Sequence, residues 1–254
     1  MLSDKSRARD RMDPGVSTVL IAAIAAVGVG CVVVGCIAAL AKRSRRRVQD
    51  RVQPRRSQPE GLAEVDDTRS LGDVQPASSG EGPLTWRRYH IPLPTTASSA
   101  ERVLQFIEKH IRELSPSLLA EFEKTTGAER RFAIGDEYDI IILGPWNGRV
   151  RIADVQDTSF TMETLEGHPE AGRITFRVRD TANGRLAEIE SLARSRDGLV
   201  NVAYNVLGIG KAVQTQVWIT FLQRLSGLMG GDASIDVTVE TEKVSAAEPH
   251  DAIG

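Results

Sequence analysis

The sequence predicts an α+β protein in three parts: an N-terminal transmembrane helix, a disordered linker, and a domain whose curved antiparallel sheet packs against a long C-terminal helix. Three observations lead to this prediction. An uncharged apolar run occupies residues 15–41, and a stretch rich in Pro, Ser and Gln follows over residues 42–83. From residue 84 the spacing of apolar residues changes between the periods typical of helices and of strands.

The overall composition is globular, with 41% apolar and 26% charged residues in a chain of 254. The net charge of −2 is unevenly distributed, because 12 Lys and Arg stand against 4 Asp and Glu through Arg56. The rest of the chain is therefore acidic. An acidic domain lacks the basic surface that neutralises phosphates, so we expect no nucleic-acid partner.

The apolar run of residues 15–41 is long enough to cross a membrane. Its 27 residues correspond to about 40 Å of helix, against a bilayer core of about 30 Å. A cleaved secretory signal, the alternative, would have a shorter apolar run and a small-residue cleavage site, whereas this run stops at the basic residues 42–47. We therefore expect a single-pass anchor, preceded by a short tail over residues 1–14.

The flanking charges predict how the anchor is oriented. Eight Lys and Arg residues follow the span through Arg56, and four precede it. By the positive-inside rule, the C-terminal domain lies in the cytoplasm. Ala22, Ala26 and Gly30 form a row of small residues, so a homodimer paired through this helix is a further hypothesis. The ratio of 26 Arg to 6 Lys indicates a GC-rich bacterial genome.

The linker is expected to be disordered because residues 42–83 hold four prolines and almost no large apolar residue. Beyond it, a domain is expected over residues 84–231. Its first elements are a strand over residues 86–93, a helix that begins at Ser98 or Ser99, and a second short helix that begins at Pro116 and ends before Gly127.

After Gly135 the apolar residues alternate with a period of two. Tight turns are expected at Asn147-Gly148 and Asn183-Gly184. The pattern predicts an antiparallel meander with strands over residues 137–143, 149–155, 159–165, 173–180 and 185–196.

The helical period returns over residues 210–229, which predicts the long C-terminal helix. Residues 232–254 are expected to hold an edge strand over residues 233–242 and a flexible tail. The domain thus has about six strands, two short helices and one long helix. This order is similar to the helix-grip fold of START-like and birch-allergen-like proteins, in which the sheet curls around the long helix.

A turn motif adds a resemblance to a family. Residues 164–172 read T-L-E-G-H-P-E-A-G and are followed by Phe176, while Gly135-Asp136 and Gly144-Pro145 lie upstream. These residues resemble the uncharacterised family catalogued as domain of unknown function 1990, over roughly residues 86–228. The family has no established activity, so the resemblance implies a fold and no mechanism.

His168 and Glu170 are the catalytic candidates, since a His beside a carboxylate can act as a general base near pH 7. The alternative is structural, because both lie in a turn with Gly167, Pro169 and Gly172, where polar side chains satisfy main-chain groups. The only two cysteines lie inside the apolar run, and the four His are dispersed. We therefore expect no metal site and no cofactor.

An apolar cavity beneath the long helix is the leading functional hypothesis. One alternate set on the last strand of the meander is unusually small, and a sheet face of this kind underfills the space opposite Trp218. The alternative is that Trp218 fills this space by itself. The expected ligand-binding residues are Phe160, Met162, Phe176, Ala187, Ile189, Ser191, Ala193, Trp218 and Phe221.

The sequence therefore predicts a membrane-anchored domain, facing the cytoplasm, that binds an apolar small molecule or lipid. Two other hypotheses stay open. One is a module that binds a membrane protein, and the other is an enzyme that uses His168 and Glu170.

Overall fold

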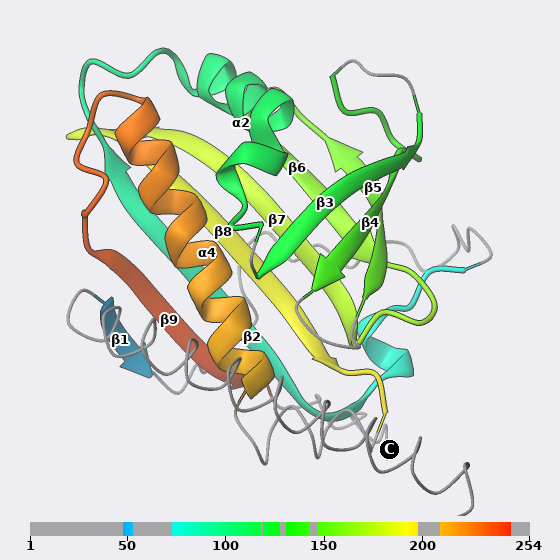
Figure 1. The fold of residues 1–254 in the computed structure, drawn as a ribbon. Coiled ribbons are helices and arrows are strands. Elements are labelled where there is room, and N and C mark those ends of the chain that lie inside the picture. Colours follow the sequence, from blue (N-terminus) through cyan, green and yellow to red (C-terminus); the bar gives the residue numbers. More distant parts are fainter. Residues whose placement is uncertain are drawn as a thin grey trace, which may run out of the picture. The chain divides into compact units, whose positions relative to one another are not determined.

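The computed structural model describes residues 48–52, 73–117, 119–127, 131–142, 147–197 and 209–244 (Figure 1). Within these residues the chain forms one nine-stranded sheet, two α-helices and a short 3-10 helix, η1 (Ala77–Ser79). The strands lie in the order β1-β9-β2-β8-β7-β6-β5-β4-β3. All neighbouring pairs are antiparallel except β1 and β9, which are parallel.

The strand bounds confirm the meander that the sequence predicts after Gly135. Each predicted strand there has a counterpart, and β5 to β8 pair in sequence order. The strands are β1 Val48–Val52, β2 Glu81–Leu93, β3 Ala120–Thr126, β4 Glu137–Ile142, β5 Gly148–Val155, β6 Ser159–Thr164, β7 Glu170–Thr181, β8 Gly184–Ser195 and β9 Val237–Val244.

Two helices lie on one face of the curved sheet (Figure 1). The long helix α4 (Ile209–Leu228) runs along the strands, as the sequence predicts, and α2 (Ala100–Leu114) packs near its C-terminal end. Ser99 caps α2, because its hydroxyl accepts a hydrogen bond from the backbone N–H of Arg102. The sheet and α4 together enclose the apolar core, which includes Tyr89, Phe176 and Phe221.

The second short helix predicted after Pro116 is wrong, because these residues form the edge strand β3. Leu119 and Phe122 are both buried, and their spacing of three fits one face of a helix. The residues around Phe122 also alternate in burial, and Phe122 pairs with Ile140 of β4. Pairing with β4 therefore decided between two patterns that this short segment fits equally well.

The disorder predicted for residues 42–83 is also wrong for the part of this segment that the structure describes. Residues 48–52 form β1, and residues 73–83 contain η1 and the first three residues of β2. Val74 forms a β-bridge with Leu165, and the Gln75 N–H donates a hydrogen bond to Thr164 O at 2.7 Å. This order comes from main-chain pairing with few apolar side chains, so composition alone misses it. Residues 42–47 and 53–72 lie outside the described residues.

The strand expected at the edge after α4 is β9. It lies between β1 and β2, so it is second from the edge. The predicted tail 1–14 and membrane span 15–41, with the small-residue row at Ala22, Ala26 and Gly30, lie outside the described residues. No helix in the described part of the chain has the length and hydropathy needed to cross a bilayer.

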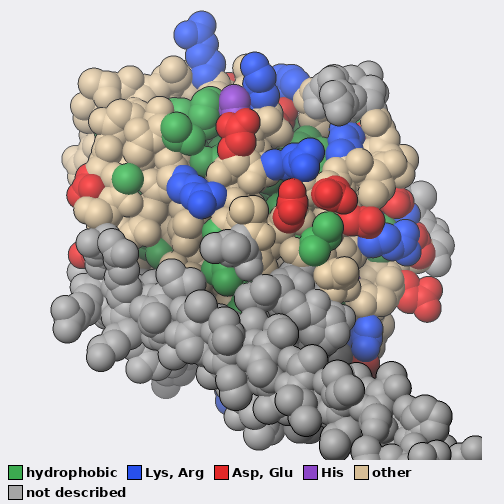
Figure 2. Space-filling model, in the orientation of Figure 1, with side chains coloured by type: hydrophobic (Ala, Val, Ile, Leu, Met, Phe, Trp, Pro, Cys, Tyr) green, Lys and Arg blue, Asp and Glu red, His purple; other side chains and the backbone are tan. Residues whose placement is uncertain are grey.

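Acidic and basic side chains intermingle on the face that carries α2 and the β3–β4 edge (Figure 2). The Arg131 Nε donates to Glu108 on α2 at 3.1 Å, and the Lys124 Nζ lies 2.7 Å from Asp136. The charges on this face are therefore arranged largely as local pairs.

Candidate cavity beneath the long helix

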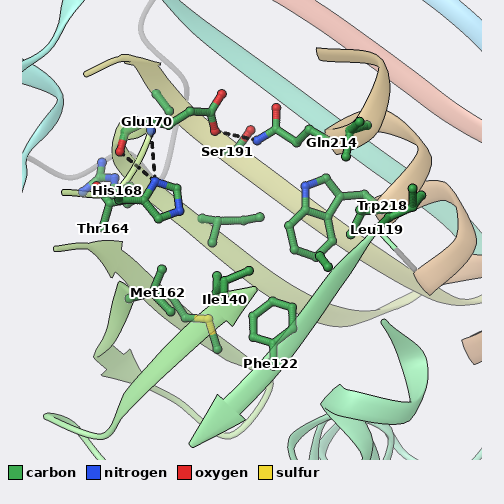
Figure 3. Close-up of a pocket in the computed structure, with 17 residues that line it drawn as sticks. Leu119, Phe122, Ile140, Met162, Thr164, His168, Glu170, Ser191, Gln214 and Trp218 are labelled. Atoms are coloured by element: carbon green, nitrogen blue, oxygen red, sulfur yellow. Dashed lines mark hydrogen bonds between the residues drawn. The ribbon is translucent and has the colours of Figure 1, made fainter. Parts of the chain in front are cut away.

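A cavity of about 80 Å³ lies between the first half of α4 and the sheet (Figure 3). It is bounded by β3 to β8, by the turn before β7 and by one side of α4. Its apolar lining comprises Leu119, Ala120, Phe122, Ile140, Val150, Met162, Ile174, Ala193, Val213 and Val217. Its other lining residues are Thr164, His168, Glu170, Arg173, Ser191, Gln214 and Trp218.

The predicted ligand-binding residues divide into two groups. Met162, Ser191, Ala193 and Trp218 line the cavity. The others pack in the filled core beside it and are nearly inaccessible to solvent: Phe160, Phe176, Ala187, Ile189 and Phe221. On the face of β8 that carries small side chains, Ser191 and Ala193 border the cavity, whereas Ala187 and Ile189 lie in the packed core.

Aromatic packing explains why the other end is full. The Phe176 ring stacks on Phe160 with centroids 4.7 Å apart, and meets Trp218 edge-on at 5.5 Å. Phe221 lies 5.6 Å from Phe176 on the α4 side. Trp218 belongs to both regions, because it closes the aromatic cluster and forms one wall of the cavity. Both expectations thus hold in part: there is a cavity, and aromatic side chains fill the rest of the interior.

A polar network crosses one end of the cavity. Gln214 on α4 donates from Nε2 to Glu170 Oε2 at 2.7 Å, and its Oε1 accepts from Arg87 Nη1 at 2.7 Å. The Arg87 Nη1 also lies 3.7 Å from Glu170 Oε1. The buried carboxylate and the buried guanidinium therefore compensate each other's charge, as burial of ionised groups requires.

His168 lies in the cavity wall, and its ring is fixed by the main chain. Its Nδ1 lies 2.9 Å from Glu170 O and 3.0 Å from Glu170 N. Burial lowers the pKa of His168 to about 4, so the imidazole is neutral at pH 7. Figure 3 shows the other ring nitrogen turned toward the interior of the cavity.

The predicted pair of His168 and Glu170 therefore adopts a different arrangement from an imidazole–carboxylate dyad. The imidazole bonds to the backbone of Glu170, while the carboxylate bonds to Gln214. The hydrogen bond from His168 to the main chain of the turn agrees with the structural interpretation, in which polar side chains satisfy main-chain groups. Both residues nevertheless line the cavity, which the sequence did not predict. Gly148 makes room for the ring, since a Cβ there would come within 2.1 Å of His168 Cδ2.

Gln75 holds the turn in place, although it belongs to the segment expected to be disordered. Its Nε2 donates to His168 O at 2.9 Å and to Glu170 O at 2.8 Å, and its Oε1 accepts from Gly167 N at 3.2 Å. Sequence reasoning missed Gln75, Arg87 and Gln214. A signal existed for Arg87 alone, because it occupies an inward position among the alternating buried residues of β2.

Two buried donors of the lining lack a partner. The Ser191 Oγ and the Trp218 Nε1 form no hydrogen bond within the part of the chain that the structure describes. Ser191 is 3% exposed and Trp218 is 7% exposed. Figure 3 shows the nitrogen-bearing edge of the Trp218 indole on the side of the cavity where Ser191 and Gln214 lie. Unpartnered buried donors are costly, so they point to something that the cavity is built to receive.

Among the described residues, no three or more His, Cys, Asp or Glu side chains are grouped so that they could hold a metal ion. The lining is instead a mostly apolar wall with one polar end. Such an arrangement suits an uncharged organic molecule better than an ion.

Comparison with known proteins confirms the family resemblance over part of the chain. Residues 117–224 match the sequence profile of the family described as domain of unknown function DUF1990. This match is shorter than the segment 86–228 over which the sequence resembles the family. No curated protein matches the chain.

Several solved structures are similar at low identity. The KanY protein is 10% identical, with a TM-score of 0.44 over 59% of this chain and 100% of that one. Protein CV1439 from Chromobacterium violaceum is 13% identical, with a TM-score of 0.40 over 58% and 98% of the two chains. A point mutant of norcoclaurine synthase from Thalictrum is 14% identical, with a TM-score of 0.38 over 59% and 97%.

Proposed function

We propose that the domain binds a small, mostly apolar molecule in the cavity beneath α4. One observation carries this proposal: a hollow with an apolar wall and unpartnered buried donors adjoins a densely packed aromatic core. Protein interiors normally leave few voids larger than a water molecule. A space that the adjacent aromatic packing leaves open is therefore best explained by an occupant.

The size of the cavity favours a compact ligand. Its volume of about 80 Å³ lies below the roughly 300–1,000 Å³ typical of ligand pockets, and an apolar cavity of about 150 Å³ holds one benzene ring. The space is about half as large as that benzene site, so it holds a molecule of a few heavy atoms as it stands, and a five-membered ring enters when the lining side chains shift. A long-chain lipid would require α4 to move away from the sheet, so we favour the compact molecule.

Methionine methyl groups provide a direct test, because the chain has only four methionines. Met162 lines the cavity, whereas Met229 lies beyond the end of α4. The full chain, labelled with 13C at the methionine methyls and held in lipid nanodiscs, is titrated with methylenecyclopentane. We expect a saturable shift of the Met162 methyl resonance and no shift at Met229.

Two variants make this titration specific. Ala193→Leu fills the cavity and should abolish the saturable shift, whereas Leu228→Ala, on the exposed end of α4, should retain it. The proposal fails if Met162 does not respond, or if the response is unchanged in Ala193→Leu.

We further propose that residues 15–41 tether the domain to a membrane with residues 42–254 in the cytoplasm. The length of the apolar run and the flanking charges support this topology. The full chain should resist alkaline extraction from membranes, and a chain without residues 15–41 should be extracted. In intact inverted vesicles, added protease should digest the C-terminal domain. Protection of the domain from the protease would show that it lies on the other side of the membrane, opposite to the proposed orientation.

An enzyme is the second candidate, favoured by the free edge of the His168 ring that faces the cavity. An imidazole with a pKa of about 4 is a weak base, so its contribution would be to orient a substrate or exchange one proton. The molecule that co-purifies with the chain would be incubated with the wild type and with His168→Gln. Conversion by the wild type alone supports an enzyme, and recovery of the unchanged molecule from both argues against it.

A further inference from the structure

The polar end of the cavity indicates the hydrogen-bonding chemistry of the ligand, in addition to its size. The unpartnered Trp218 Nε1 is a hydrogen-bond donor only, because the indole nitrogen has no lone pair to offer. The Ser191 hydroxyl can donate in any direction that its rotation permits. Both groups are more than nine-tenths buried and line the same cavity. The part of a ligand that meets them must therefore accept hydrogen bonds.

The sheet register places the Ser191 hydroxyl toward the ligand space. Ser191 pairs with Ile174 on one side and with Arg87 on the other, in a row of inward-facing positions. Ile174 offers no acceptor, and Arg87 directs its Nη1 to Gln214 Oε1. The neighbours of Ser191 in its own row thus leave the hydroxyl available to a molecule in the cavity.

The charges around the cavity argue against an anionic ligand. Glu170 is compensated by Gln214 and Arg87, and His168 is neutral at pH 7 because burial lowers its pKa to about 4. Arg173 is the one cation among the described lining residues. It alternates with the inward Ile174, so its position belongs to the sheet face that points away from the cavity. The charges of Glu163 and Glu190 act on it there.

A carboxylate in the cavity would therefore lie beside Glu170, and the one lining cation, Arg173, lies on a position of β7 that alternates with the inward Ile174 and is already under the influence of Glu163 and Glu190. Burying an uncompensated charge costs far more than a hydrogen bond returns. A neutral oxygen acceptor avoids this cost. It also satisfies the two donors that the fold leaves without partners.

We propose that the cavity selects a compact neutral molecule whose oxygen acceptor receives hydrogen bonds from Ser191 Oγ and Trp218 Nε1, such as a small ketone, ether or alcohol. This inference rests on the proposed function, since it specifies the chemistry of the same site. The apolar wall formed by Met162, Val213 and Val217 then contacts the hydrocarbon part of the ligand.

Three probes of similar size test the inference: cyclopentanone, methylenecyclopentane and cyclobutanecarboxylate. The first two differ by the exchange of a carbonyl oxygen for a methylene group, and the third carries a negative charge. Binding to the full chain in nanodiscs is followed at the Met162 methyl resonance. The readout is the ratio of the dissociation constants of cyclopentanone and methylenecyclopentane in each variant. The two probes differ in hydration, but this difference is the same for every variant, so a change in the ratio reports on the cavity alone.

We expect the preference for cyclopentanone to fall about tenfold from the wild type to Ser191→Ala/Trp218→Phe, with Ser191→Ala in between. Binding of methylenecyclopentane by the double variant shows that its cavity is still folded. Cyclobutanecarboxylate should cause no saturable shift. The Trp218 indole N–H resonance, assigned through Trp218→Phe, should move downfield with cyclopentanone and stay in place with methylenecyclopentane.

The outcomes separate this inference from the proposed function. If none of the three probes causes a saturable shift at Met162, the proposed function itself fails. If the two neutral probes bind but their ratio is the same in the wild type and the double variant, the ligand-binding site stands and the acceptor inference is overturned. Tightest binding of cyclobutanecarboxylate would overturn it as well.

Discussion

Gln214 on α4 donates a hydrogen bond of 2.7 Å to the carboxylate of Glu170 on β7 and accepts one of the same length from Arg87 on β2. In the sheet, β8 lies between β7 and β2. One neutral side chain therefore fastens the first half of α4 across three strands, at the polar end of the cavity. Hydrogen bonds to ionised partners are about twice as strong as neutral ones, so this contact fixes the position of the helix.

Replacing Gln214 by Leu should lower the free energy of unfolding by about 2–3 kcal/mol, because both charged partners lose a buried hydrogen bond. Urea unfolding of the full chain in nanodiscs measures the change. Gln156→Leu is the matched control, since Gln156 is exposed and its side chain bonds to Asp154. Its effect should stay below about 0.5 kcal/mol. Equal effects of the two variants would contradict the role given to Gln214.

The stability of the domain should depend on the protonation of His168. Burial lowers the folded-state pKa of His168 from 6.5 to about 4, so the unfolded chain takes up this proton first as the pH falls. Stability is therefore fully present above about pH 6.5 and is lost progressively toward pH 4. At about 1.4 kcal/mol per pKa unit, the loss approaches roughly 3 kcal/mol.

This dependence is measured as the difference in unfolding free energy between the wild type and His168→Gln across pH 4 to 7. The wild type should lose stability relative to the variant as the solution is acidified, because the glutamine amide does not titrate. Parallel curves for the two proteins would show that His168 titrates alike in the folded and unfolded chains.

Two alanines on β8 should differ in how much stability is lost when their side chains are enlarged. Ala193 lines the cavity, so Ala193→Leu has space for the added methylene groups and should change stability by less than about 1 kcal/mol. Ala187 is 1% exposed between Ile91 and Val178, so Ala187→Leu should destabilise the domain by about 1–3 kcal/mol. Thermal unfolding of both variants gives the comparison. Similar losses would mean that the 193 end is as densely packed as the 187 end.

Gln75→Ala should loosen the turn that carries His168 and Glu170. It removes the three hydrogen bonds of the Gln75 amide, and we expect a loss of about 2–3 kcal/mol in unfolding free energy. The affinity for methylenecyclopentane should fall too, since the turn forms one wall of the cavity. Gln105→Ala, at an exposed position of α2, is the control and should leave both quantities unchanged. An unaltered Gln75→Ala protein would mean that the turn is stable without this support.

Local patterns predicted most of the regular elements of the domain. The capping residue Ser99 and the apolar positions of α2, the period of two through β4 to β8 and the apolar face of α4 each reflect interactions within a few residues of the chain. They failed at β3, where the spacing of Leu119 and Phe122 fits a helix, whereas the burial of Ala120 and Phe122 fits a strand. They failed again at residues 73–83, whose order depends on hydrogen bonds to a turn about ninety residues away.

The sequence by itself determined the acidic domain, the apolar run of residues 15–41, the meander and its covering helix, and the small residues of β8. These follow from composition and periodicity, which neighbouring residues establish. Only the tertiary structure decided that β8 leaves space near Ser191 and none near Ala187. It alone brought Arg87, Glu170 and Gln214 together. Packing and ion pairing join residues far apart in the chain, and no local pattern encodes the distances between them.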